Sequence, residues 1–130
     1  MLLRIGISAS VAISGYVHYD LYRCGYRYVD MIGPSFLVQA AVSFAIAVLL
    51  LLGGPFTLRI AGAGLAGGAL VAFALSRTVG IFGFTEIGWE PAPEAAISFL
   101  AEIATVALVV VSALLRLWVW WRHRTSRGVV

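Results

Sequence analysis

Long apolar stretches alternate along this chain with short segments that are rich in glycine, proline and charged residues. The apolar stretches predict four helices, at about residues 2–21, 34–53, 58–82 and 94–121. A membrane-spanning helix needs roughly 20 apolar residues, and the last three stretches reach this length. The first is shorter, and we interpret it as a membrane helix rather than a cleaved signal peptide. The pattern predicts an all-α polytopic membrane protein in which four transmembrane helices form one bundle.

The composition agrees with a membrane protein and excludes several other classes. The 130 residues are 62% hydrophobic and 12% charged, and the mean hydropathy is +0.99. Soluble domains average about 45–50% apolar and about 25% charged residues, and a small soluble domain buries too little surface to hide so much apolar area. We therefore exclude a soluble enzyme, a nucleic-acid-binding module and a disordered tail. The lipid bilayer is the expected partner.

The few charges are sorted between the two sides that four spans would create. All nine basic residues are arginines, and the net charge is +3. One side has arginines and no acids, at Arg4, Arg59, Arg116, Arg122, Arg124 and Arg127. The other side has Arg23, Arg27 and Arg77 with all six acids. Since cytoplasmic flanks collect arginine, both termini are predicted to be cytoplasmic in a multi-pass protein of the plasma membrane, with residues 122–130 as a basic tail that attracts anionic lipids.

A stripe of small residues marks the third apolar stretch. Its members recur every four residues, at Gly64, Gly68, Ala72, Ser76 and Gly80. Residues four apart share a helix face, and small side chains let helix backbones approach closely in lipid. We expect this stripe to pack inside the bundle. Packing against a second copy of the chain is the alternative.

Each predicted helix also places one polar side chain in the outer half of the membrane, at His18, Gln39, Arg77 and Glu102. Ionisable groups in hydrocarbon are costly unless they are paired, so they normally face the bundle interior. We therefore predict an outward-opening polar pocket built from these four side chains, with Glu86 as a lid partner. A histidine beside carboxylates can move protons, and an arginine can bind an anionic head group.

A simpler interpretation of two of these residues is a structural ion pair. Arg77 and Glu102 would neutralise each other and join the third helix to the fourth. No metal or haem site is predicted, because His123 lies on the side of the membrane opposite to His18. The single cysteine, Cys24, excludes an internal disulfide and a CxxC redox pair. These residues alone predict no cofactor.

The first outer connection, residues 18–30, is rich in tyrosine and arginine. These residue types favour ordered contact surfaces. They also form aromatic belts at the level of the lipid head groups. The segment is therefore either an interfacial belt or a docking surface for a membrane-protein partner.

Several short motifs resemble those of DoxX-type membrane proteins. They are the opening Leu2-Leu3-Arg4, the His18 after the first helix, and Gly53-Gly54-Pro55-Phe56-Thr57-Leu58-Arg59 before the third, together with the four-span layout. Residues 18–39 and 76–102 also resemble small, uncharacterised four-helix membrane proteins of actinobacteria. The DoxX resemblance implies an association with membrane oxidoreductase assemblies and quinone-linked redox chemistry. This chain departs from such chemistry because it lacks paired redox cysteines and a pair of haem-ligating histidines.

Two expectations about function follow. The first is a non-catalytic accessory or assembly subunit of a membrane complex, a redox complex if the resemblance holds, which contacts a membrane-protein partner or further copies of itself. The second is a protein that binds quinone or another small molecule in the predicted pocket. An enzyme is less favoured than either. A channel is also disfavoured, because no polar stripe suited to line a pore is evident.

Overall fold

The computed structural model describes residues 1–127, which form four α-helices and one short 3-10 helix. In chain order they are α1 (Leu2–Arg23), the 3-10 helix η1 (Tyr26–Tyr28), α2 (Ile32–Leu51), α3 (Phe56–Ser76) and α4 (Glu94–Arg127). The predicted all-helical fold is confirmed, because every predicted apolar stretch coincides with one α-helix.

Three of these helices are long and apolar enough to cross a membrane, over Ile32–Leu51, Phe56–Ser76 and Glu94–Thr125. Helix α1 has 22 residues, but it contains Arg4, His18 and three serines, so its apolar character is weaker. Large apolar side chains such as Val71 and Leu100 are more than half exposed. Such side chains suit contact with lipid. The protein is therefore a helical membrane protein with three clearly apolar spans in the described part of the chain.

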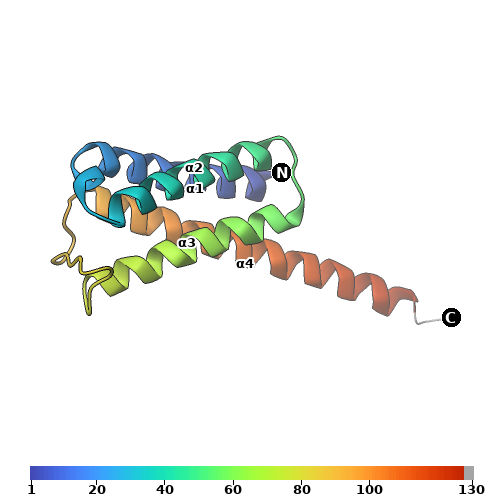
Figure 1. Cartoon of the computed structure of the whole chain (residues 1–130). Coiled ribbons are helices and arrows are strands. Elements are labelled where there is room, and N and C mark those ends of the chain that lie inside the picture. Colours follow the sequence, from blue (N-terminus) through green and yellow to red (C-terminus); the bar gives the residue numbers. More distant parts are fainter. Residues whose placement is uncertain (128–130) are drawn as a thin grey trace.

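Figure 1 shows α1 and α2 side by side, with α3 and α4 crossing on one side of that pair. Helix α1 packs mainly against α2 and α4, and α3 packs more against α4 than against α2. The connections 24–31 and 77–93 meet at one end of the bundle, which we call the loop end (Figure 1). The N-terminus and the connection 52–55 lie at the other end, which we call the turn end.

The apolar core lies between α1, α2 and α4 in the half of the bundle near the turn end. Its buried members are Ile7, Val11, Ile46, Ala47, Leu50 and Val109. Ser8 lies beside this core, and its hydroxyl donates a hydrogen bond to the carbonyl oxygen of Ala47 (2.7 Å). The other half of the bundle contains a polar network and a cavity, which form the candidate site below.

A close approach of two backbones occurs between α1 and α2. A Cβ added at Gly15 would lie 2.7 Å from the Cβ of Ser43, so a larger residue does not fit there without a shift. The predicted stripe on α3 does not make such contacts, because a Cβ added at Gly64 or Gly68 would have no atom within 4 Å. A spacing of four drifts by about 40° per step on a helix of 3.6 residues per turn, so the stripe passes from the exposed Gly64 to the buried Ser76 and faces the interior only near the loop end.

The ends of α3 and α4 also differ from the prediction. Helix α3 ends at Ser76 rather than near residue 82. The N–H of Gly80 donates to the carbonyl oxygen of Leu75 (2.7 Å), and Gly80 has a φ of +85°, a left-handed conformation that ends helices. Gly80 thus belongs to the connection and not to the stripe. Helix α4 continues to Arg127, so the first part of the predicted basic tail is helical, and residues 128–130 lie outside the described residues.

Candidate functional site

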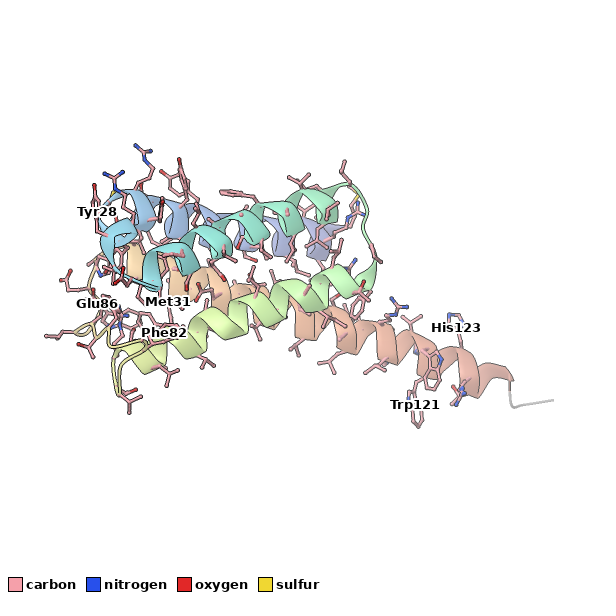
Figure 2. The ribbon with its side chains drawn as sticks, viewed as in Figure 1. Tyr28, Met31, Phe82, Glu86, Trp121 and His123 are labelled. Atoms are coloured by element: carbon pink, nitrogen blue, oxygen red, sulfur yellow. The ribbon has the colours of Figure 1, made fainter. Side chains whose placement is uncertain are left out.

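A cavity of about 220 Å³ lies at the loop end, and all four helices and both connections at that end contribute to its wall. The five residues of the predicted pocket all line it, namely His18 from α1, Gln39 from α2, Arg77 and Glu86 from the connection 77–93, and Glu102 from α4. Figure 2 shows Glu86 at the loop end of the bundle, where the two connections meet. The cavity is therefore a suitable place to ask what the predicted residues do.

Glu102 forms the buried polar wall of the cavity, and only 2% of the residue is exposed. Its Oε1 accepts a hydrogen bond from the Ser14 hydroxyl on α1 (3.0 Å). The same oxygen accepts a second from the Ser98 hydroxyl, one turn earlier on α4 (2.7 Å). Because a buried carboxylate without partners is costly, these two hydroxyls explain how Glu102 is tolerated at this depth and why α1 and α4 stay together here.

His18 is the second buried titratable residue of the wall. Its Nδ1 lies 2.9 Å from the carbonyl oxygen of Ser14, and a carbonyl only accepts, so Nδ1 carries a proton. The other ring nitrogen, Nε2, lies 4.0 Å from the Oε1 of Glu102. One mobile proton on either Nε2 or the carboxylate makes this contact attractive. The pair can therefore hold a proton and pass it to a ligand in the cavity.

The network continues toward the turn end through hydroxyl groups. The Thr105 hydroxyl, which is fully buried, lies within hydrogen-bond distance of the Ser10 hydroxyl (2.8 Å) and of the Ala101 carbonyl oxygen (2.9 Å). Ser10 is one turn before Ser14 on α1. Hydroxyls of this kind are common contacts between helices in lipid, where small polar groups join neighbouring backbones.

Arg77 does not pair with Glu102, so the ion pair considered as the simpler interpretation is not formed. Helix α3 ends one residue before Arg77, and the guanidinium turns to the connection that follows. It donates hydrogen bonds to the carbonyl oxygens of Gly88 (3.2 Å) and Glu90. It also lies 4.0 Å from the centre of the Phe73 ring. Arg77 thus holds the connection 77–93 against the end of α3.

Glu86 and Tyr26 form the contact that joins the two connections at the loop end. The Tyr26 hydroxyl donates to the Oε1 of Glu86 (2.7 Å). Burial raises the pKa of the Tyr26 phenol, and the hydrogen bond and charge of Glu86 raise it further. The phenol therefore stays protonated, and able to donate, at physiological pH. Both residues line the cavity, so this contact lies in its wall, and the lid role of Glu86 stays a prediction.

Two aromatic clusters contribute side chains to the wall of the cavity, although Trp89 of the second cluster does not itself line it. In the first, the Phe36 ring lies 5.0 Å from His18 and 5.1 Å from Tyr26 between ring centres. In the second, Phe73, Trp89 and Phe99 lie 5.3 to 5.6 Å from one another. Ring centres at these distances make favourable contacts. A planar ligand would therefore meet aromatic faces and edges on two sides.

Gln39 is the polar residue of the wall that the rest of the chain leaves unengaged. Its side chain is half-buried and lines the cavity, and among the described residues no hydrogen bond to its amide occurs. The amide offers two donors and one acceptor. A ligand with a carbonyl or hydroxyl group would satisfy it.

Sequence reasoning missed the hydroxyl partners and the aromatic walls. Ser14 and His18 are four residues apart, as are Ser98 and Glu102, so each pair lies on one helix face. This spacing was the available signal, because polar residues that repeat at helical spacing inside apolar helices mark an interior face. No comparable pattern pointed to the aromatic residues, which come from separate elements.

No protein-family model, curated protein or solved structure matches this chain.

Proposed function

We propose that this is a four-span protein of the plasma membrane with both termini in the cytoplasm, and that its loop-end cavity binds a small, planar, amphipathic molecule of the quinone class from the outer leaflet. The observation that carries the proposal is the cavity itself, in which two aromatic clusters enclose a buried carboxylate, an imidazole and an unengaged amide. The proposed orientation follows from the arginine distribution. The turn end has arginines without acidic residues, and cytoplasmic flanks collect arginine, so this end would lie inside.

The size of the cavity favours a single-ring head group. Drug-sized ligands occupy clefts of about 300–1,000 Å³, and this cavity of about 220 Å³ is smaller. A ring with polar substituents fits between the aromatic clusters, and an apolar tail would leave through the side of the bundle into lipid. Gln39 would bond one substituent, and the pair of His18 and Glu102 would bond another or exchange a proton with it.

The proposal concerns binding rather than catalysis. The sequence contains one cysteine, and its two histidines lie toward opposite ends, with His123 near the far end of α4 (Figure 2). The sequence has neither a dithiol that could carry electrons nor a pair of histidines at one depth that could ligate a haem. A protein of this kind would hold, deliver or protect its ligand for a separate redox partner, as the DoxX resemblance implies.

Tryptophan fluorescence can test ligand binding at this site. Trp89 packs against Phe73 and Phe99 of the cavity wall, and the variant W118F/W120F/W121F leaves it as the single tryptophan. Titration with a short-chain benzoquinone should quench its fluorescence in a saturable way. A quenching curve that rises linearly with quinone concentration, as in free solution, would contradict the proposal.

Two glycines of α3 provide the matched variants for this titration. Neither has an atom within 4 Å of an added Cβ, but Gly68 lines the cavity whereas Gly64 does not. Gly68→Leu should weaken quinone binding by about tenfold, because a side chain in the space of a ligand costs about 1–3 kcal/mol. Gly64→Leu should leave binding unchanged. Equal effects of both variants would argue against this cavity as the site.

An accessory role in a membrane complex is the second candidate, and the exposed surface of the loop end favours it. Tyr28 is 76% exposed, and Arg27 lies 4.6 Å from the centre of its ring. Arg23 lies over Tyr19 in a similar pair. Tyrosine and arginine are enriched at the energetic centres of interfaces. Purification in mild detergent separates the candidates, since a stoichiometric protein partner supports the accessory role and a lone protein with bound quinone supports the cavity.

A further inference from the structure

The turn end gathers arginines without any acidic residue. Arg4 begins α1, Arg59 lies in the first turns of α3, and Arg116 lies on α4. Residues 31–85 and 103–130 contain no aspartate or glutamate. The positive charge at this end therefore has no carboxylate of the chain to pair with, unlike the charges at the loop end.

Two of these arginines converge on one aromatic ring. The guanidinium carbons of Arg59 and Arg116 lie 5.6 Å and 5.0 Å from the centre of the Phe56 ring. Arg59 also donates a hydrogen bond to the buried Ser112 hydroxyl on α4, which fixes its position. The Nε atoms of Arg4 and Arg59 are buried and have no hydrogen-bond partner. These two atoms are too buried to meet a ligand, but each guanidinium has five N–H donors and Arg116 is exposed, so this end is suited to an external group that accepts hydrogen bonds.

An apolar groove lies directly beside this arginine pair. It has a volume of about 410 Å³ and is lined by Phe56, Ala113, Arg116, Leu117 and Trp120. Apart from Arg116, these side chains offer carbon surface to an occupant. The groove thus places the positive charge of Arg116 beside apolar side chains of α3 and α4.

The position of Arg116 along α4 places the groove at a membrane surface. From Glu94 to Arg116 the helix rises by about 33 Å at 1.5 Å per residue, and the hydrocarbon core of a bilayer is about 30 Å thick. With Glu94 at one interface, Arg116 lies at the other. On the same rise, Trp120 lies about 6 Å farther out than Arg116 and Ala113 about 4.5 Å farther in, so the groove extends from the level of the lipid head groups to the level at which acyl chains begin.

We propose that the turn end binds one anionic diacyl phospholipid, with its phosphate between Arg59 and Arg116 and an acyl chain that passes through the groove and leaves it past Ala113 toward the membrane interior. Arginine suits this role because its planar group bonds phosphate oxygens in pairs. Basic pockets between membrane helices bind anionic head groups in this way. The inference does not depend on a ligand in the loop-end cavity.

A lipid explains both parts of the site, whereas a free phosphate explains one. Inorganic phosphate would satisfy the guanidinium groups but leave the apolar groove unoccupied. A phospholipid brings the charge and the chain together, and it is present in the bilayer at high local concentration. The lipid is therefore the occupant that fits the charge, the groove and their depth.

Brominated phospholipids can test the site, because bromine on an acyl chain quenches a nearby tryptophan. The variant W89F/W118F/W121F leaves Trp120, in the groove, as the single tryptophan. We expect acyl-brominated phosphatidylglycerol in detergent micelles to quench Trp120 at lower mole fraction than brominated phosphatidylcholine does. Equal quenching by the two lipids would overturn the proposal.

Arg116→Gln and Arg122→Gln form a matched pair for this measurement. Both remove one charge from α4, but Arg122 lies over Trp118 and outside the groove. Arg116→Gln should lower the preference for phosphatidylglycerol by about fivefold, the effect of about 1 kcal/mol per arginine near a charged surface. Arg122→Gln should change it by less than about twofold. An equal loss in both variants would mean diffuse attraction and would overturn a defined site.

Two further controls keep the result interpretable. Ala113→Leu narrows the groove without changing charge, so it should reduce quenching by both lipids, and unchanged quenching would place the chain elsewhere. Excess inorganic phosphate should not displace the lipid, and full displacement would reassign the site to phosphate alone. Circular dichroism and the thermal midpoint should show that Arg116→Gln remains folded. If that variant unfolds, Ala113→Leu with the phosphate competition decides the question.

Discussion

The two ends of this bundle differ in the partners of their charged side chains. At the loop end, Glu102 is bonded by hydroxyls of the chain and approached by His18, and Arg77 is bonded by main-chain carbonyls. At the turn end, Arg59 and Arg116 share an aromatic ring, and buried Nε atoms have no partner. Polar groups that are satisfied internally stabilise the bundle. The arginines at the turn end have no aspartate or glutamate nearby, and this suits the anionic lipid proposed above.

Apolar packing shows the reverse contrast. The apolar core fills the bundle toward the turn end, where Ile7 and Leu50 are fully buried. The loop end instead encloses a cavity with hydroxyls and aromatic rings in its wall. Apolar packing is thus expected to stabilise mainly the half near the turn end, whereas hydrogen bonds stabilise the loop end around the cavity. The following predictions test this division, from the largest expected effect to the smallest.

The orientation of the two ends gives an all-or-none result. Cys24 is exposed at the end of α1, so a membrane-impermeant maleimide should label it on intact cells. A Cys24→Ser/Thr125→Cys variant moves the thiol to the far end of α4, and it should react only after lysis. Labelling of the second variant on intact cells, with none at Cys24, would reverse the proposed topology.

Glu102→Ala should be the most destabilising change at the loop end. It removes the acceptor of two buried hydrogen bonds, and such bonds between membrane helices are worth about 0.6 to 1.7 kcal/mol each. We expect a loss of about 2 kcal/mol in the free energy of unfolding, measured by titration with a denaturing detergent. Glu102→Gln retains an acceptor oxygen and should lose less than half as much. Equal losses of unfolding free energy in the two variants would show that the hydrogen bonds to Glu102 do not account for its contribution to stability.

Double-mutant cycles should distinguish the partner of Glu102. His18→Ala and Glu102→Ala should be coupled, because Nε2 and Oε1 are 4.0 Å apart. Arg77→Ala and Glu102→Ala should add to within about 0.5 kcal/mol, as expected for residues that share no hydrogen-bond partner. Strong coupling of the second pair would restore the Arg77–Glu102 ion pair that the structure does not form.

The hydrogen bond from Tyr26 to Glu86 should make the smallest contribution to the free energy of unfolding, and this contribution should depend on pH. Tyr26→Phe removes one hydrogen bond to a carboxylate, which contributes about 1.5 kcal/mol. Because the folded protein raises the pKa of Tyr26 above its ordinary value of 10.0, this contribution is complete below pH 10 and is lost as the pH rises through the folded pKa. The stability difference between wild type and Tyr26→Phe should therefore be constant from pH 7 to 10 and should shrink above it.

Tyr28→Phe is the control for that measurement, since Tyr28 is exposed and its hydroxyl bonds only to its neighbour Arg27. It should change stability little at any of these pH values. A difference between wild type and Tyr26→Phe that grows with alkaline pH would contradict the assigned role of the phenol.

The helices were predictable because apolar periodicity and length decide them, but their ends were not. The end of α3 depends on Gly80 adopting a left-handed conformation and on its bond to Leu75. Apolar residues continue past this point to Phe82, so hydropathy gave no signal. The predicted end of α4, at residue 121, was wrong for the opposite reason. Its last turns are polar but contain no glycine or proline before Gly128, so the helix continues.

The residues of the candidate site were predictable from their depth, but their partners were not. Positions along the predicted helices indicate one membrane depth for His18, Gln39, Arg77 and Glu102. They do not determine the direction in which each side chain points. Arg77 seemed the obvious partner of Glu102 because their charges are opposite. The end of α3 at Ser76 decides otherwise, since it releases Arg77 into the connection while serines on α1 and α4 satisfy the carboxylate.

The way Arg77 holds the connection 77–93 has a consequence for sequence variation. The guanidinium bonds the carbonyl oxygens of Gly88 and Glu90 rather than their side chains. Every amino acid has a carbonyl, so this contact imposes no side-chain identity at position 90. Position 88 is restricted only by its φ of +59°, which asparagine also tolerates. Because Arg77 holds the connection 77–93 through its main chain, the exposed side chains of this connection can vary while Arg77 itself is required.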